Sequence, residues 1–171
     1  MAMEHVDATC NWLMHSAELR RQIDSLDAPE PGGNRAYWRR NFEDRSREDY
    51  AILDDEGRHV GNCGLMGIDL RRSKAELWIY LGEARGKGAG GIALRLLLER
   101  AFSGLGLARV HLRVVESNER AVAFYERAGF SIEGRARGDT IHDGIRLDSI
   151  LLSLLAEEYK SPDRSKDGSG K

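Results

Sequence analysis

Cysteine is scarce in this sequence, and its scarcity excludes several classes of site. The 171 residues include two cysteines, Cys10 and Cys63, which are too few for a disulfide framework, and no Cys-x-x-Cys motif occurs. The five histidines also lack the His-x-x-x-His spacing that places two metal ligands on one helix face. We therefore expect no metal site.

Long apolar runs and an excess of one charge are missing as well. The N-terminus has no apolar signal core, and no run is long enough to cross a membrane. A net charge of −2 gives no electrostatic case for nucleic acid, whose binding domains are usually basic over one face. The sequence thus predicts a cytoplasmic protein with neither membrane nor nucleic acid as a partner.

The length of the chain suits one compact domain with a core of its own. The segment 161–171 (SPDRSKDGSGK) is polar and has no large apolar residue, so we expect it to be disordered. Everything before it is assigned to a single domain, residues 1–160.

The first quarter of the chain has the pattern of two helices joined by a loop. Trp12, Leu13 and Leu19 belong to an apolar stripe that predicts a helix over residues 3–25. Two prolines and two glycines predict a loop over 27–34, and a second, short, Arg-rich helix is expected over 35–45.

After residue 45 the pattern changes to that of a mixed sheet. Strands are expected at 50–53, 59–68, 75–81 and 110–115, with two more within 130–155 around a turn at 143–144. Further helices are expected at 88–102 and 118–128. The strand–helix–strand unit over 75–115 requires a parallel pair with a right-handed crossover, whereas the strands before it form an antiparallel meander. The fold class is therefore α+β in the broad sense.

A glycine-rich turn stands between the third strand and its helix. It reads Arg85-Gly86-Lys87-Gly88-Ala89-Gly90-Gly91. Unpaired N–H groups at a helix N-terminus and the helix dipole favour an anion there, and glycine lets that anion approach the main chain. Phosphate or pyrophosphate is the ligand that this turn predicts.

Two alternatives for this turn fit less well. A Walker A loop needs Gly-x-x-x-x-Gly-Lys-Ser/Thr, but the run from Gly82 to Lys87 is one residue short and Gly88 replaces the metal-binding hydroxyl. A plain tight turn would use glycine only for positive φ, and four glycines between residues 86 and 91 exceed that need.

A dinucleotide-binding fingerprint is the third alternative. Gly86, Gly88 and Gly91 match Gly-x-Gly-x-x-Gly, and Glu116 is a late candidate for the acidic residue that should follow. However, a Rossmann domain begins with this unit, whereas antiparallel hairpins precede it here. A nicotinamide-dependent oxidoreductase stays open as the minor alternative.

The turn and its surroundings resemble the GNAT acetyltransferase superfamily. Arg85-x-x-Gly88-x-Gly90 matches the acetyl-CoA pyrophosphate loop of that family, Arg/Gln-x-x-Gly-x-Gly/Ala. The segments 75–81 (AELWIYL) and 110–115 (VHLRVV) resemble its fourth and fifth strands, and 118–130 (NERAVAFYERAGF) resembles the helix that follows. The closest likeness is to the branch with ribosomal-protein N-terminal and amino-sugar acetyltransferases. The resemblance covers about residues 47–156.

The resemblance implies a central mixed, mostly antiparallel sheet flanked by helices. Its fourth and fifth strands would be parallel and splayed, with the pantetheine arm of acetyl-CoA in the gap. The chain departs from the family at its start, because the usual strand before the first helix is hardly provided by Met1–Val6.

The same resemblance implies a site for acetyl-CoA as cosubstrate. Backbone groups of the strand segment would pair with pantetheine, a main-chain N–H there would stabilise the oxyanion, and Asn118 would hydrogen-bond the pantetheine. The predicted binding residues are Ile79, Tyr80, Leu81, Arg85, Gly86, Lys87, Gly88, Ala89, Gly90, Gly91, Asn118 and Tyr125. Asn118 also suits a helix N-cap.

The implied reaction is direct attack of an amine on the thioester, with both substrates bound. Tyr125 is the predicted general acid, because a neutral phenol can donate a proton to the departing thiolate. Glu76 is the candidate base, acting through water, with Glu116 and His111 as runners-up. Glu76 could instead be a surface carboxylate paired with an arginine, and His111 could be structural.

The acceptor is less constrained than the cofactor. In the family, selectivity comes from segments that correspond to residues 10–45 and 131–148. A small-molecule primary amine such as an amino sugar is favoured, with a protein N-terminal amine next, and a homodimer is left open. The alternative from another class is an acyl-CoA-binding module without turnover.

Overall fold

The structure, a computed structural model, describes residues 1, 4–22, 33–82, 88–142 and 144–160. Five α-helices, one π-helical turn and six strands follow one another in these residues. In chain order they are α1 (Glu4–His15), α2 (Ala17–Gln22), α3 (Gly33–Glu43), β1 (Glu48–Leu53), β2 (His59–Asp69), β3 (Lys74–Leu81), α4 (Ala89–Glu99), η1 (Arg100–Gly104), β4 (Arg109–Val115), α5 (Glu119–Arg127), β5 (Ser131–His142) and β6 (Ile145–Leu155). Each predicted strand is present.

The single helix predicted over 3–25 is wrong, because Ser16 divides it into α1 and α2. The Ser16 Oγ accepts a hydrogen bond from the N–H of Leu19 at 3.0 Å and so caps a new helix. Residues 23–25 lie outside the described residues, as does most of the loop predicted over 27–34. The second helix is confirmed, although α3 begins at Gly33, inside the predicted loop.

The helix predicted over 88–102 is present with a different ending. After α4 the chain widens into the π-helical turn η1, in which the N–H of Leu105 donates to the carbonyl of Arg100 at 2.9 Å. Gly106 then adopts a φ of +66°, a conformation that favours glycine. Gly106 thus lets the chain turn out of the helix towards β4.

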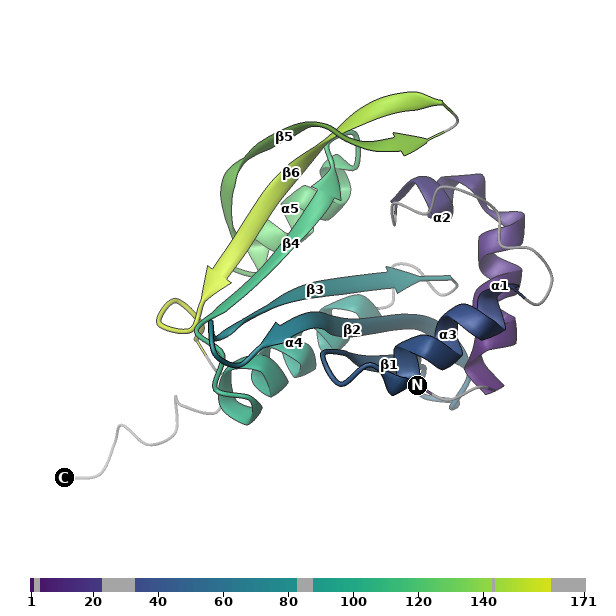
Figure 1. The fold of residues 1–171 in the computed structure, drawn as a ribbon, viewed down its shortest axis with the longest axis horizontal. Coiled ribbons are helices and arrows are strands. Elements are labelled where there is room, and N and C mark those ends of the chain that lie inside the picture. The colour runs from purple at the N-terminus through teal and green to yellow at the C-terminus, as the bar shows by residue number, and fades with distance from the viewer. Residues whose placement is uncertain (2–3, 23–32, 83–87, 143, 161–171) are drawn as a thin grey trace.

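The six strands form one sheet in the order β1-β2-β3-β4-β6-β5. All neighbours are antiparallel except β3 and β4, which are parallel and share three residue pairs, ending at Glu76 and His111. Figure 1 shows these two strands starting side by side and then diverging. The mixed, mostly antiparallel sheet with a splayed parallel pair is therefore confirmed.

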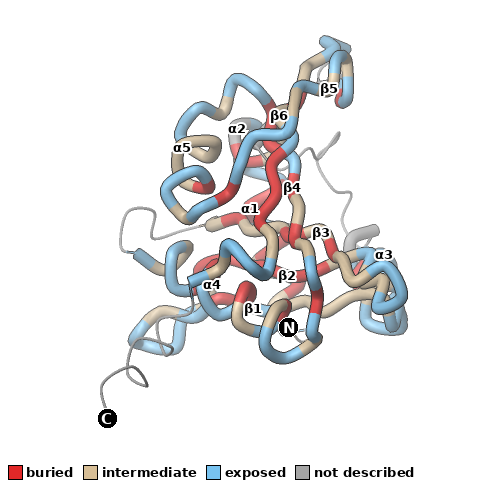
Figure 2. The backbone as a smooth tube through the Cα atoms, turned by 90° about the vertical axis from the view of Figure 1, so that its left-hand side faces the viewer, coloured by how far each residue is buried: buried red, intermediate tan, exposed pale blue. Residues whose placement is uncertain are grey.

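The two faces of the sheet carry different layers. The main core lies under α4 and α5, and Leu77, Leu97, Val110 and Leu152 belong to it. Because side chains alternate along a strand, Trp78 and Tyr80 of β3 fall on the other face or its margin, where Tyr80 packs with side chains of α1 and α2. Burial concentrates along the central strands (Figure 2).

A buried polar network ties α1 to β2 and β3, and it consists of Thr9, His59, Asn62 and Tyr80. The Asn62 amide donates to the Thr9 hydroxyl at 2.7 Å and to the Tyr80 hydroxyl at 2.8 Å. Its carbonyl oxygen lies 2.8 Å from Nε2 of His59. Asn62 is fully buried, and these contacts supply the hydrogen bonds that water makes to an exposed amide.

Trp12 fixes α1 against the end of β3. A Cβ at Gly82 would lie 1.9 Å from the Trp12 ring, so only glycine permits this contact. Gly82 lies three residues before Arg85, where the glycine-rich turn begins. The N-terminal helices therefore pack on the approach to that turn.

A carboxylate on β5 provides a pH-dependent contribution to stability. Glu133 accepts hydrogen bonds from the Arg109 guanidinium at 2.7 Å and the Ser153 hydroxyl at 2.8 Å, and these lower its pKa from 4.5 to about 2. The stability that the ionised Glu133 adds to the folded state is complete above the unfolded-state pKa. It is lost as the pH falls from about 4.5 towards 2.

We expect Glu133→Gln to reduce the free energy of unfolding by about 1 kcal/mol at pH 7, since the pair is partly exposed. The difference from wild type should vanish towards pH 2, as measured by urea unfolding at several pH values. Glu126→Gln, at an exposed position on α5, is the matched control. A difference that persists unchanged at pH 2 would contradict the assignment.

None of the described helices is long and apolar enough to cross a membrane.

Candidate functional site

Hydrogen bonds at both ends of β3 show which way its backbone groups point. Before the strand, the carbonyl of Ser73 accepts from the N–H of Ala108 near β4 at 2.8 Å. After the strand, the N–H of Gly82 donates to the carbonyl of Val60 on β2 at 3.0 Å. Backbone groups alternate along a strand, so odd-numbered residues of β3 face β4 and even-numbered ones face β2.

The odd-numbered residues beyond the last pair therefore face an open edge. Ile79 and Leu81 direct their N–H and C=O groups towards β4, but β4 has diverged by then. A chain placed in this gap could pair with them as a strand would. Tyr80 differs from its neighbours, because its backbone faces β2 and its hydroxyl belongs to the buried polar network.

The glycine-rich turn leads into α4. Gly88 is the N-cap with a φ of +85°, and no side chain caps the helix there. Gly91 donates to the Gly88 carbonyl, but the N–H groups of Ala89 and Gly90 precede the first intrahelical bond and suit an anion. No described atom lies within 4 Å of a Cβ built at Gly91. Arg85, Gly86 and Lys87 lie outside the described residues.

Asn118 begins α5, as an N-cap. Its Oδ1 accepts from the N–H of Ala121 at 3.2 Å, so the capping role foreseen for it is present. The side-chain amide N–H groups take no part in this cap. The helix ends before Gly129, whose φ of +99° favours glycine.

Tyr125 projects from α5 into the main core, where its ring packs edge-on against Phe124 and Phe130. Burial raises the pKa of Tyr125, and the Cys63 thiol adds to this rise. Cys63 lies on β2, paired with Ile79 of β3, so the phenol lies close to the part of the sheet where the gap opens. The hydroxyl is protonated at neutral pH and is a potential donor.

Glu76 lies on the opposite face of the sheet from the main core and is held by an ion pair. The Arg113 Nε is 3.3 Å from its Oε1, and the Arg113 Nη1 is 3.5 Å from Oδ2 of Asp139. The neighbouring Glu76 carboxylate raises the pKa of Arg113, so the guanidinium stays charged. The arginine-paired alternative for Glu76 is thus observed, and it links β3 to β5 across β4 and β6.

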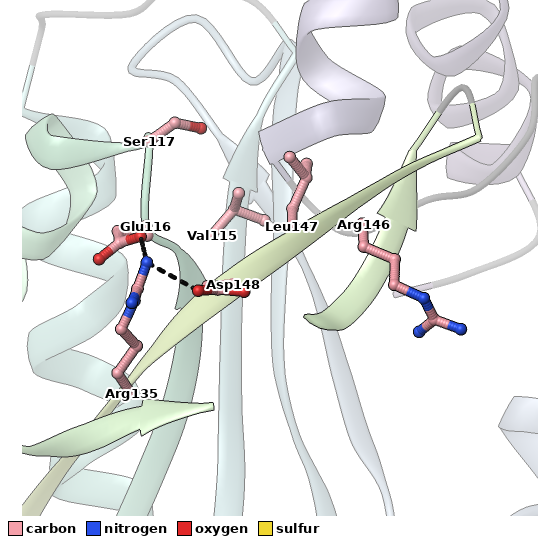
Figure 3. A pocket seen from close by; sticks show the side chains of 7 residues that line it. All are labelled: Val115, Glu116, Ser117, Arg135, Arg146, Leu147 and Asp148. Carbon is pink, nitrogen blue, oxygen red and sulfur yellow. Dashed lines mark hydrogen bonds and ion pairs between the residues drawn. The ribbon is translucent and has the colours of Figure 1, made fainter. Parts of the chain in front are cut away.

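Glu116, the other runner-up, lies apart from Glu76, at the end of β4. Its carboxylate accepts from Arg135 at 2.8 Å, and Arg135 also pairs with Asp148 at 2.7 Å. These residues line an open pocket of about 250 Å³, together with Ser117 just before α5 (Figure 3). Because Ser117 is one of its lining residues, the pocket lies beside Asn118.

Sequence reasoning missed Arg113 and Asp139 as members of the site. The alternation of side chains along β4 could have indicated Arg113, because it follows His111 by two residues and so lies on the same face of the sheet. Nothing local indicated Asp139, because its proximity to Arg113 depends on how β5 passes beside β6.

The chain also matches known proteins. A family model described as the acetyltransferase (GNAT) domain matches residues 1–131, which is most of the chain. The chain belongs to this family. Membership of this family argues against the Walker A, dinucleotide and plain-turn alternatives for the glycine-rich turn. The protein is therefore an acyltransferase, and its family uses acetyl-CoA.

Curated GNAT relatives are named for different acceptors. YdaF of Bacillus subtilis strain 168, by name a ribosomal N-acetyltransferase, is 35% identical over 124 residues, which cover 72% of this chain and 67% of YdaF. A spermidine N(1)-acetyltransferase of Escherichia coli K12 is 26% identical over 121 residues, or 70% of this chain and 64% of the relative. The matches thus span about two thirds of these relatives.

Solved structures confirm the fold. Spermidine N-acetyltransferase from Vibrio cholerae in complex with CoA and spermine gives a TM-score of 0.84 at 21% identity, covering 93% of this chain and 94% of that one.

Among the described residues, no three His, Cys, Asp or Glu side chains are grouped as a metal site would require.

Proposed function

We propose that this GNAT protein transfers the acetyl group of acetyl-CoA to the primary amine of a small molecule, with both substrates bound at once. The unpaired inner edge of β3 carries the proposal. Peptide-like groups of a pantetheine arm would complete the ladder at Ile79 and Leu81, in the manner of a substitute strand.

The residues around the gap fit acetyl-CoA. The N-terminus of α4 suits the pyrophosphate, because the free N–H groups of Ala89 and Gly90 and the helix dipole point to the same place. Arg85 and Lys87 would add positive charge to this site. Asn118 has side-chain N–H groups available for the pantetheine amides. Bound acetyl-CoA supplies an activated acyl group, and the chain has to orient it.

Two groups of the chain act on the reacting atoms. A main-chain N–H on the β3 edge would donate to the thioester oxygen, where negative charge develops. The protonated Tyr125 hydroxyl would donate its proton to the sulfur that leaves. The amine approaches from the opposite face, where the Glu76–His111 pair lies.

The acceptor face favours a cationic small molecule. Three carboxylates lie on this face, Glu76 on β3 and Glu133 and Asp139 on β5, and two arginines pair with them, so these five side chains carry one excess negative charge. Carboxylates attract ammonium groups, and relatives are named for spermidine. A polyamine and an amino sugar are therefore the first acceptors to test, followed by a peptide with a free N-terminus.

Thermal unfolding with acetyl-CoA, CoA or NAD at equal concentration tests cofactor binding, because a ligand of the folded state raises Tm. We expect acetyl-CoA and CoA to raise Tm and NAD to leave it unchanged. Thiol release with spermidine, glucosamine and the peptide then tests transfer. If CoA binds but no acceptor causes release of the CoA thiol from acetyl-CoA, the binding-module alternative is favoured.

Replacing Gly88 is expected to weaken acetyl-CoA binding. Gly88→Val places a branched side chain at a φ of +85°, which distorts the N-terminus of α4. We expect Kd for acetyl-CoA to rise about tenfold or more, equivalent to the loss of at least one charge-assisted hydrogen bond. Isothermal titration calorimetry measures this directly.

Gly106→Val is the matched control, because Gly106 also has a positive φ, at +66°, but follows η1 on the way to β4. Its strain should lower Tm by a similar amount without changing Kd. Equal Kd values for both variants would show that the turn at Gly88 does not bind the cofactor.

A further inference from the structure

His111 lies where the two central strands part. Its partner on β3 is Glu76, and this is the last pair before β3 and β4 diverge. Val110 and Leu112 on either side of it belong to the main core, so alternation puts His111 on the acceptor face. The imidazole and the Glu76 carboxylate therefore stand side by side at the closed end of the gap.

The carboxylate of this pair is already engaged. Arg113 contacts Glu76 at 3.3 Å and is itself positioned by Asp139. The Oε1 atom of Glu76 is thus occupied by a charge-assisted contact that links β3 to β4 and, through Arg113, to β5. Glu76 is therefore held in the ion pair that positions Arg113.

The imidazole is better placed to take a proton. No hydrogen bond or ion pair joins its ring to any other described residue. Charged groups face it from three strands: Glu76 and Lys74 on β3, Arg109 on β4 and Glu133 on β5, while Ser153 is its partner on β6. Burial lowers the pKa of His111 below its usual 6.5, so the ring is neutral at pH 7 and offers a lone pair.

We propose that His111, rather than Glu76, accepts the proton of the acceptor amine, a role that rests on the proposed acetyl transfer. A ring nitrogen takes one proton from the substrate ammonium and so frees the nitrogen lone pair. The C–N bond then forms as the C–S bond breaks. The imidazolium passes its proton to water.

The remaining proton transfers balance within the site. The attacking nitrogen loses its second proton to water after the C–N bond has formed. The leaving sulfur gains a proton from the Tyr125 hydroxyl, and the resulting tyrosinate takes one back from water. One proton is therefore released to water for each acetyl group transferred. The carboxylates of Glu76 and Glu133 would stabilise the imidazolium while it exists. Acid and base thus come from opposite faces of the sheet.

The pH dependence of kcat/KM with acetyl-CoA and spermidine, followed by thiol release from pH 5 to 9, tests this assignment. Wild type should lose activity as the pH falls, with a midpoint below 6.5, because His111 becomes protonated. In His111→Gln, kcat/KM at pH 7 should fall about 100-fold and this acidic limb should disappear. KM for acetyl-CoA should not change.

Three further variants separate the roles. Glu76→Gln should retain the acidic limb, and added imidazole should restore part of the activity of His111→Ala. His15→Gln, at an exposed position on α1, should behave as wild type. The Tm of each variant shows whether it has folded.

An acidic limb that persists in His111→Gln and disappears in Glu76→Gln would overturn the assignment and leave the proposed function intact. If spermidine gives no turnover in wild type, glucosamine and the peptide take its place. Absence of thiol release with all three would contradict the proposed function, and the role of His111 with it.

Discussion

Tyr125→Phe should lower kcat by about 10²–10⁴-fold and leave Kd for acetyl-CoA nearly unchanged. The substitution removes only a hydroxyl, and the phenyl ring retains its edge-on packing against Phe124 and Phe130. The sulfur must then leave without its proton donor, which raises the barrier of the transfer step. Steady-state kinetics and calorimetric titration measure the two quantities separately.

Tyr159→Phe is the matched control. The Tyr159 hydroxyl has no hydrogen-bond partner in the part of the chain that the structure describes, and its ring packs on Phe102, which lies in η1. Its loss should therefore affect neither kcat nor Kd. If Tyr125→Phe retains kcat within twofold of wild type, Tyr125 is not the general acid.

Asn62→Leu should lower the free energy of unfolding by about 3 kcal/mol, because it removes the centre of the buried polar network. The hydroxyl of Tyr80 and the ring of His59 would each lose the hydrogen bond to Asn62, and each such loss costs about 1–3 kcal/mol. Thr9 would suffer less, because its hydroxyl also donates to the carbonyl of His5 at 2.9 Å.

Urea unfolding measures this effect as a lower midpoint with an unchanged m-value. Asn11→Leu makes the same change at an exposed position on α1, and it should alter stability by less than about 0.5 kcal/mol. Equal losses for the two variants would mean that the network does not hold α1 against the sheet.

The sheet could be predicted because its sequence signals are local. The alternation over 75–81 and the helical patterns over 88–102 and 118–128 are each set by a few neighbouring residues. The order of strand, helix and strand then required a parallel pair. The helix that carries Tyr125 also followed from its local pattern, whereas the chemical role of Tyr125 came from the family resemblance and stays a prediction.

Contacts between distant segments could not be read from the sequence in this way. Ser16 is a cap only because the chain turns there, and the apolar stripe continues across it. The bridge from Glu76 through Arg113 to Asp139 joins three strands, whose lateral order no local pattern specifies. Asn62 carries no sign of burial in a run rich in glycine.

The splay of β3 and β4 gives the sheet two inner edges in addition to its two outer ones. Exposed edges tend to recruit strands from other molecules, and proteins usually block them. Here the inner edges face each other, and only three residue pairs join the halves of the sheet. Backbone groups beyond Glu76 and His111 can therefore be paired by a molecule that enters between the two halves, whereas the outer edges are open to the surrounding solution.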